Sequence, residues 1–430
     1  MKASEYKARL LENNPKAKAN YHLPAIPMYE QLTQMLWKAL QGDKVWAIMQ
    51  ALGLDKYDES QYKAELEGEC LKVTEKVTPR LYKLFNEVKQ RVGMEHGVDF
   101  FIVSSHEVNA FARTIIPTDP NAPFTVVIHS ATIETMTETE LCYVVGHELG
   151  HLMDESLILS KVFSFVFPTE NIPIPLQYKY LFWHQLSELF ADRYGYLAVK
   201  DINACISAQF KLKSGLQLEK MEVDMNSFLE YNHEVLQHYI TGQALDLFYG
   251  PYGRTHPVSP IRIEALNLFA NAKTEKELND GMNELVSIIG RLNTDNELGR
   301  SYLEFIASAG LLLAEADGEI TQDETEVILK YMSNYHMFPK DLLIEISKQD
   351  RFEVFNRSVN AILQKNPNCR EGLFLYMADI MVSDRDFNKA ELDLLAQVAQ
   401  KVFQFDQETF LNLLKHCIQE RFLPTTESIS

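Results

Sequence analysis

The chain has 430 residues, a length that predicts two or three domains. Hydrophobic residues make up 46% and charged residues 23% of the sequence, the balance of a soluble globular protein with a sizeable core. The formal net charge of −19 argues against nucleic acid as a partner, since nucleic-acid-binding proteins present a basic face.

The sequence predicts a cytoplasmic protein with no membrane span. The N-terminal segment is polar and rich in lysine, unlike a secretory leader. The most apolar stretch, residues 157–167, is too short and too polar to cross a bilayer. Five dispersed cysteines form no C-x-x-C pair, which indicates reduced thiols. They are Cys70, Cys142, Cys205, Cys369 and Cys417.

The first third of the chain predicts helices followed by a small sheet. We expect a helical extension over residues 1–65 and helical structure over residues 62–92, where apolar side chains recur near the 3.6-residue period. Two runs rich in β-branched and aromatic residues, 98–103 and 124–129, predict strands. A proline-rich loop over residues 113–123 separates them and is long enough to cover a cleft.

The next predicted helix carries two histidines. It begins at Thr137, which forms a capping-box pattern with Glu140. His147 and His151 are four residues apart, so both imidazoles face one side of the helix and can reach a common ion. Glu148 lies about 100° round the helix, beside that ion. The H-E-x-x-H pattern predicts a zinc site with an adjacent base.

A second predicted helix, residues 181–200, supplies further carboxylates. Glu188 and Asp192 are also four residues apart, so they share a helix face. Glu188 suits a third zinc ligand, and Asp192 would then accept the free N–H of His147 and fix its tautomer. Three protein ligands leave one position for water, whose proton Glu148 is placed to take. This is the chemistry of peptide hydrolysis, with one zinc ion per chain.

The rest of the chain predicts helices. Ser259 and Pro260 begin one helix, with Ser259 as N-cap and Pro260 at the first helical position. Residues 292–300 are the best linker candidate, and the sequence after them is helical in pattern. The run 317–324 is echoed at 384–391, each copy between two helical segments, which predicts two paired-helix halves.

The motifs resemble those of the HtpX and CAAX-prenyl-protease family of gluzincin zinc metallopeptidases. The resemblance spans about residues 70–275 and lies in four motifs: Asn109-Ala110-Phe111-Ala112, His147-Glu148-Leu149-Gly150-His151, Glu188-Leu189-Phe190-Ala191-Asp192, and Thr255-His256-Pro257 with Arg262. It implies an α+β zincin-like domain, mostly helical with a small sheet. The best-known members are embedded in membranes, and since this chain shows no spanning segment, a prenylated or membrane substrate is not implied.

The same resemblance implies roles for the motif residues. The zinc ligands would be His147, His151 and Glu188, with Glu148 as general base. His256 and Arg262 would face the site and stabilise the oxyanion. Asn109, Ala110 and Phe111 would belong to an edge strand that receives the peptide substrate in extended form.

Some residues have alternative interpretations. Without the resemblance, Arg262 would be read as one half of a surface ion pair, and residues 109–112 as an ordinary turn. His184 lies four residues before Glu188 and is a rival ligand. The remaining histidines without partner spacing are expected to be structural or at the surface. They are His22, His96, His106, His233, His238, His336 and His416.

Residues 300–425 resemble the tellurite-resistance TerB-like helical domain, through Ala314 to Ile320 followed by Glu324. Acidic residues at Asp317 and Asp384 suit either a divalent cation or simple turns. The patterns Thr321-x-x-Glu324 and Asn388-x-x-Glu391 favour turns that precede capped helices. No catalytic set is visible here, so we expect an all-α binding or sensing module with a possible protein partner.

The predicted organisation is therefore a helical extension (1–65), a zinc metallopeptidase domain (66–290) and a TerB-like all-α domain (300–425). The predicted function is a zinc metalloendopeptidase that cuts peptides or unfolded proteins. Two alternatives stay open: a latent or non-catalytic scaffold that works through the TerB-like domain, and a zinc hydrolase of non-peptide substrates. Glu148 favours an active enzyme, because a structural zinc site needs no base.

Overall fold

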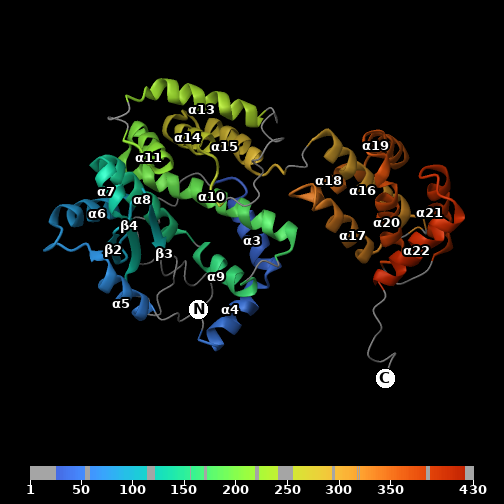
Figure 1. Cartoon of the computed structure of the whole chain (residues 1–430), viewed down its shortest axis with the longest axis horizontal. Coiled ribbons are helices and arrows are strands. Elements are labelled where there is room, and N and C mark those ends of the chain that lie inside the picture. The colour runs from blue at the N-terminus through green and yellow to red at the C-terminus, as the bar shows by residue number, and fades with distance from the viewer. Residues whose placement is uncertain are drawn as a thin grey trace. The chain divides into compact units, whose positions relative to one another are not determined.

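The computed structural model in Figure 1 describes residues 26–53, 59–113, 122–154, 156–168, 172–217, 222–240, 255–292, 296–316, 318, 320–383 and 388–421. The chain divides into two compact units, residues 1–290 and 291–430. The predicted linker, 292–300, begins beside this boundary, and its last four residues belong to the next helix. None of the helices in the described ranges combines the length and the apolarity that a bilayer crossing requires.

The first unit is mostly helical and contains one small sheet. Its helices are α3 (Tyr29–Ala39), α4 (Gly42–Ala51), α5 (Glu59–Glu69), α6 (Pro79–Val92), α7 (Ser130–Thr135), α8 (Glu138–Met153), α9 (Ser156–Val166), α10 (Ile174–Val199), α11 (Ile202–Ser214), α13 (Met225–Ile240), α14 (Ser259–Asn271) and α15 (Glu275–Ile289). Its strands are β1 (Leu71–Lys72), β2 (Val98–Val103), β3 (Ala110–Arg113) and β4 (Phe124–His129).

The described sheet has the order β1-β2-β4-β3. β2 and β4, the two predicted strands, pair in parallel with Val98 opposite Phe124. β4 is almost wholly buried, as expected of a central strand with a continuous apolar run. β3 pairs antiparallel with β4 and forms one edge of the sheet. The edge that carries Ala110 to Arg113 therefore faces outward from the sheet.

α8 and α10 pack against each other at glycine positions. A Cβ on Gly150 would lie 2.9 Å from the Cα of Ala191, and one on Gly146 would lie 2.6 Å from the Cβ of Ala198. Gly195 of α10 allows the same close approach from the other side. Real Cβ atoms do not sit so close to these atoms, so only glycine lets the two helices approach this closely. This contact sets the distance between the histidines of α8 and the carboxylates of α10.

Other contacts fix α8 and α10 within the unit. α8 begins with the predicted capping box between Thr137 and Glu140. Glu140 is buried, and the ammonium of Lys211 on α11 lies 2.9 Å from its carboxylate. At the N-terminal end of the described chain, Trp183 of α10 donates to Thr33 of α3. The described part of the N-terminal extension thus packs onto the first unit.

Three predicted element boundaries were wrong. The helical pattern of residues 62–92 contains two helices, α5 and α6, with β1 between them. Pro79 explains the break, since proline is tolerated in a first turn but not in a helix interior. The helix predicted at 181–200 begins earlier, at Ile174, where Pro175 also lies in the first turn. The N-cap of α14 is Val258, one residue before the predicted Ser259.

The second unit is built from helices only, in its described residues. They are α16 (Glu297–Ala314), α17 (Gln322–Met332), α18 (Pro339–Ser347), α19 (Arg351–Lys365), the short 3-10 helix η1 (Pro367–Cys369), α20 (Arg370–Met381), α21 (Lys389–Lys401) and α22 (Gln407–Arg421). α16 is the central helix and contacts α17, α18, α19, α20 and α21. The hydroxyl of Tyr376 on α20 donates to the carbonyl of Ile306 on α16 at 2.5 Å. The two echoed sequence segments, 317–324 and 384–391, follow α16 and α20 in the chain and run into α17 and α21.

The capping predictions for this unit have different outcomes. Thr321 and Glu324 form the predicted capping box at α17. Asn388 caps α21 by accepting from the backbone N–H of Ala390 rather than from that of Glu391. Asp317 and Asp384, the two candidate cation ligands, lie outside the described residues.

Candidate metal centre

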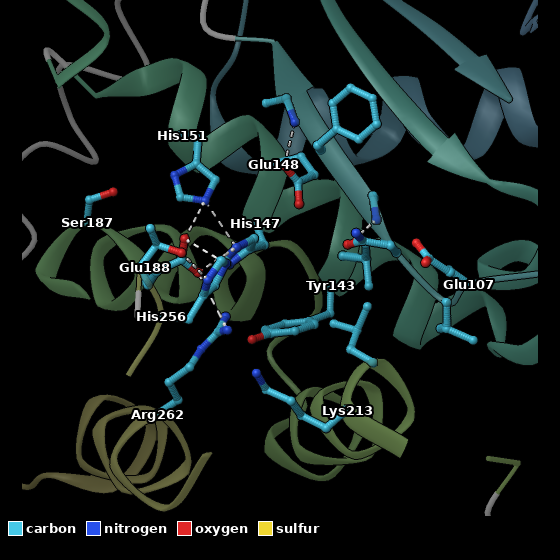
Figure 2. Close-up of a pocket in the computed structure, with 18 of the residues that line it drawn as sticks. Glu107, Tyr143, His147, Glu148, His151, Ser187, Glu188, Lys213, His256 and Arg262 are labelled. Carbon is cyan, nitrogen blue, oxygen red and sulfur yellow. Dashed lines mark hydrogen bonds and ion pairs between the residues drawn. The ribbon is translucent and has the colours of Figure 1, made fainter. Parts of the chain in front are cut away.

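Three side chains from α8 and α10 converge on one point. His147 and His151 project from α8, and Glu188 projects from α10 toward them (Figure 2). The Nε2 atoms of the two histidines are 3.2 Å apart. Glu188 Oε2 lies 3.5 Å from His147 Nε2, and Glu188 Oε1 lies 3.4 Å from His151 Nε2. All three residues offer a ligand atom within 4.8 Å of the others.

These separations fit a tetrahedral zinc ion. Ligand atoms about 2.05 Å from a tetrahedral zinc lie about 3.3 Å from one another. The two imidazole nitrogens are 3.2 Å apart, and each lies 3.4 or 3.5 Å from a different oxygen of Glu188, which is close to that value. Glu188 Oε2 is buried and accepts no hydrogen bond from the described residues. A buried carboxylate oxygen without a hydrogen-bond donor is costly unless a cation binds it. Two imidazoles and one carboxylate are also the donor set of catalytic zinc sites.

The charges around this point also favour a cation. Burial disfavours the ionised form of Glu188, but His151, His147 and Arg262 outweigh burial and hold its pKa well below the ordinary value. Burial likewise disfavours the charged form of His147, but Asp192 and Glu188 raise its pKa to about 10. The surrounding carboxylates therefore stabilise a positive charge at this position, whether a proton or a metal ion carries it.

Asp192 lies directly behind His147. Its Oδ1 is 2.9 Å from His147 Nδ1, the imidazole nitrogen that points away from Glu188. Arg262 of α14 grips the same carboxylate with two donors, Nε at 2.8 Å from Oδ2 and Nη2 at 2.6 Å from Oδ1. Arg262 is only 7% exposed, so the alternative of a surface ion pair was wrong. Its remaining nitrogen, Nη1, lies 3.5 Å from Glu188 Oε2.

Tyr143 and Gln209 complete this buried network, and sequence reasoning did not identify either. The hydroxyl of Tyr143 donates to Asp192 Oδ1 at 2.7 Å. The amide of Gln209 donates to Asp192 Oδ2 at 3.2 Å and to the hydroxyl of Tyr143 at 2.8 Å. Tyr143 precedes His147 by four residues and so shares its helix face, a signal that was available. Gln209 lies on α11, and nothing in its local sequence points to the site.

Glu148 faces β3 across the cavity from this network (Figure 2). Its Oε2 accepts the backbone N–H of Ala112 at 2.7 Å. Burial raises the pKa of Glu148, and the nearby imidazoles only partly oppose that effect. A carboxylate with a raised pKa holds a proton more readily than an exposed one, which suits a group that must both accept and return a proton.

The histidines His256 and His184 both border the site in different ways. His256 Nε2 lies 3.4 Å from Glu188 Oε1, and the His256 side chain is half exposed. His184, the rival ligand, is outside the group of converging ligand atoms. Its ring packs edge-on against Tyr180, with ring centroids 4.6 Å apart. Burial lowers the pKa of His184 to about 4, so the imidazole is neutral at pH 7.

A cavity of about 850 Å³ opens over the metal centre. Its walls include the segment from His106 to Ala112, so the predicted substrate residues Asn109, Ala110 and Phe111 border it. Phe111 is 41% exposed. Residues 114–121, most of the loop expected to cover the cleft, lie outside the described residues. The structure therefore brings all ten predicted site residues into one region of the first unit.

Comparison with known proteins shows that part of this region is similar to a known family. Residues 75–172 match peptidase family M48. That segment includes His147, Glu148 and His151 and ends before Glu188. The chain is also 27% identical over 171 residues to the plastoglobule-localized metallopeptidase 48, chloroplastic, of Arabidopsis thaliana. The alignment covers 38% of this chain and 48% of the relative, so this chain spans about half of the relative's length. No solved structure matches the chain.

Proposed function

We propose that the first unit is a zinc-dependent metalloendopeptidase. The observation that carries the proposal is the set of three separations of 3.2 to 3.5 Å among His147, His151 and Glu188, with the Glu148 carboxylate beside them. The match of residues 75–172 to peptidase family M48 supports it. In this proposal His147, His151 and Glu188 hold one zinc ion per chain.

Each residue has a distinct task in this mechanism. When bound, zinc supplies a Lewis acid that polarises the substrate carbonyl and lowers the pKa of a water molecule. Glu148 takes a proton from the attacking water and then delivers it to the leaving amine. Before substrate binds, the Ala112 N–H, 2.7 Å from Oε2, holds this carboxylate toward β3. Asp192 holds His147 in the tautomer whose Nε2 is free to bind metal.

We assign His256 and Arg262 to the carbonyl oxygen of the substrate, on which negative charge develops. His256 is half exposed in the cavity wall and is the donor that we assign to the developing oxyanion. Two of the three guanidinium nitrogens of Arg262 already bind Asp192. We therefore assign Arg262 first to holding Asp192 and Glu188 in place, and only its Nη1 side to the oxyanion.

We propose that β3 receives the substrate chain. In the free protein, two of its outward backbone donors are already engaged. The N–H of Ala110 donates to Asn109 Oδ1 at 2.9 Å, and that of Ala112 donates to Glu148. A peptide that adds along β3 must replace these side-chain acceptors with its own carbonyls. Docking of substrate would then free Glu148 for proton transfer.

The rival proposal, a latent zinc scaffold that works through the second unit, differs in what it predicts for Glu148. We assign the second unit to a TerB-like binding module with a protein partner, and the whole protein to the cytosol. The sequence has five dispersed cysteines and no C-x-x-C pair, which is consistent with that location. A scaffold needs the zinc ligands but not the base, so substitution of the base separates the two proposals.

The decisive experiment measures cleavage of an unfolded protein by the zinc-loaded full chain. Glu148→Gln removes the proton acceptor with little change in shape, so we expect cleavage to fall by roughly 100- to 10,000-fold while one zinc per chain remains bound. Equal cleavage by wild type and variant would end the peptidase proposal. Zinc content reports on the ligands: Glu188→Ala should lose zinc and His184→Ala should keep it.

A further inference from the structure

We propose that a second, smaller pocket between α11, α13 and α14 binds a large apolar side chain of the substrate, close to the bond that is cut. This inference rests on the proposed peptidase function and adds a substrate class to it. The pocket has a volume of about 340 Å³. Its apolar walls are Phe210 of α11, Phe228, Tyr231 and Val235 of α13, and Pro260 and Ile263 of α14.

The walls of this α11–α13–α14 pocket are suited to an aromatic or branched side chain. The rings of Phe210 and Phe228 meet edge to face, with centroids 5.1 Å apart. Ile263 is 5% exposed and forms a fixed surface, whereas Tyr231 is 63% exposed and stands at the surface. Protein recognition sites often place an exposed tyrosine beside an apolar pocket. The tyrosine ring adds contact area at low entropic cost.

The pocket adjoins the cavity over the candidate metal centre. Lys213 and Ser214, at the end of α11, line both. Figure 2 places Lys213 across the larger cavity from Glu148, on the side of Tyr143 and Arg262. Neighbouring residues of another segment border the two separately, since His256 lines the larger cavity and Ser259, three residues later, lines the smaller pocket. A peptide in the larger cavity therefore lies next to the smaller pocket.

The volumes of the cavity and of the pocket indicate which part of a substrate each could hold. Ligand sites usually occupy about 300–1,000 Å³. The cavity of about 850 Å³ suits a stretch of peptide, and the pocket of about 340 Å³ suits one side chain that branches from it. Lys213 at the junction is the only charged residue among the described lining residues of the pocket. A small side chain therefore gains little from the apolar walls, and an acidic side chain would lose its hydration there and meet a cation only at the junction.

The test compares an alanine-based peptide with versions that carry Phe, Leu, Trp or Asp at each position in turn. In wild type, one position should favour Phe, Leu or Trp over Ala by at least about 10-fold in kcat/KM, the effect of filling an apolar pocket. Val235→Trp fills the pocket from its own wall, so the Phe-to-Ala ratio should fall toward one. Glu234→Trp introduces the same side chain on the exposed side of α13 and should keep the wild-type ratio.

A binding measurement separates this inference from the peptidase proposal. Fluorescence anisotropy with labelled Phe and Ala peptides, in the Glu148→Gln background, reports the pocket without cleavage. Tighter binding of the Phe peptide, lost when Val235→Trp is added, supports the pocket even if wild type cuts nothing. Cleavage with equal kcat/KM for all peptides, equal binding of both peptides, or an unchanged ratio in Val235→Trp would overturn the inference.

Discussion

At the scale of single residues, Asp192 connects the candidate metal centre to the protein interior. One carboxylate, 1% exposed, lies against the imidazole of His147, the guanidinium of Arg262, the hydroxyl of Tyr143 and the amide of Gln209. Arg262 holds the pKa of Asp192 far below its ordinary value, against the effect of burial. Asp192 therefore stays ionised and keeps its acceptor role toward His147 throughout the range in which proteins are folded.

The outer members of this network should influence zinc affinity without touching zinc. Tyr143→Phe removes one donor to Asp192 and keeps the ring, so the dissociation constant for zinc should rise about 10-fold, the lower end of what outer partners contribute. Competition with a chelator measures it. The same substitution at half-exposed Tyr82 of α6 is the control and should change nothing. An unchanged affinity in Tyr143→Phe would show that Gln209 and Arg262 hold Asp192 alone.

Residue spacing predicted the inner part of this site and missed the outer part. His147, His151, Glu188 and Asp192 form two i, i+4 pairs, and helix geometry alone puts each pair on one face. Gln209 reaches Asp192 from a different helix, and that contact depends on how α11 packs rather than on any local pattern. The bidentate contact of Arg262 with Asp192 could not be predicted either, because it depends on how α14 packs against α10.

At the scale of elements, the close packing of α8 on α10 links the fold to the site. The histidines and Glu188 lie on different helices, so their separations depend on the distance between the two helix axes. Gly150 lies within the H-E-x-x-H segment, and a Cβ there would meet the Cα of Ala191 at 2.9 Å. Backbone atoms cannot yield as a flexible side chain can, so the helices would have to move apart.

Gly150→Ala should therefore damage both stability and metal binding. Overpacking of this kind costs about 1–3 kcal/mol of unfolding free energy, and displaced ligands should weaken zinc binding as well. Urea unfolding and chelator competition measure the two effects. Gly68→Ala in α5, where a Cβ meets nothing within 4 Å, is the matched control and should be neutral or stabilising by up to about 1 kcal/mol. Equal behaviour of the two variants would contradict this account.

Secondary-structure elements were predictable where the periodic pattern of apolar residues was long. The prediction failed where that pattern was short. β2, β4 and α8 follow from apolar runs and from the Thr137 capping box. β1 has only two residues, Leu71 and Lys72, which is too short to show alternation. β1 forms only because it pairs with β2, and the sequence around it does not predict that tertiary contact.

At the scale of the whole molecule, the two units carry separate cores. The described core of the second unit is formed by its own helices α16 to α22. The residues of the metal centre all belong to the first unit. Zinc should therefore stabilise one unit and leave the other unaffected, because a ligand stabilises only the structure that binds it.

Calorimetry of the full chain with and without a chelator tests this independence. At a zinc concentration 1,000 times the dissociation constant, binding contributes about 4.1 kcal/mol. For a unit of this size we expect the transition of the first unit to fall by roughly 5–10 °C when zinc is removed, and the second transition to stay in place. Glu188→Ala should show the lower value with or without chelator. A shift of both transitions would mean that the units unfold together.

The pairing of β3 with β4 makes the edge of the cavity sensitive to the frame of a strand. Along an extended chain, successive side chains point to opposite faces of the sheet, so a slip of β3 by one position that keeps its pairing with β4 would exchange the faces of Ala110 and Phe111, both of which border the cavity. A single-residue insertion or deletion between Val103 and Ala110 that shifts β3 in this way would thus change the wall that meets the substrate while leaving His147, His151 and Glu188 in place.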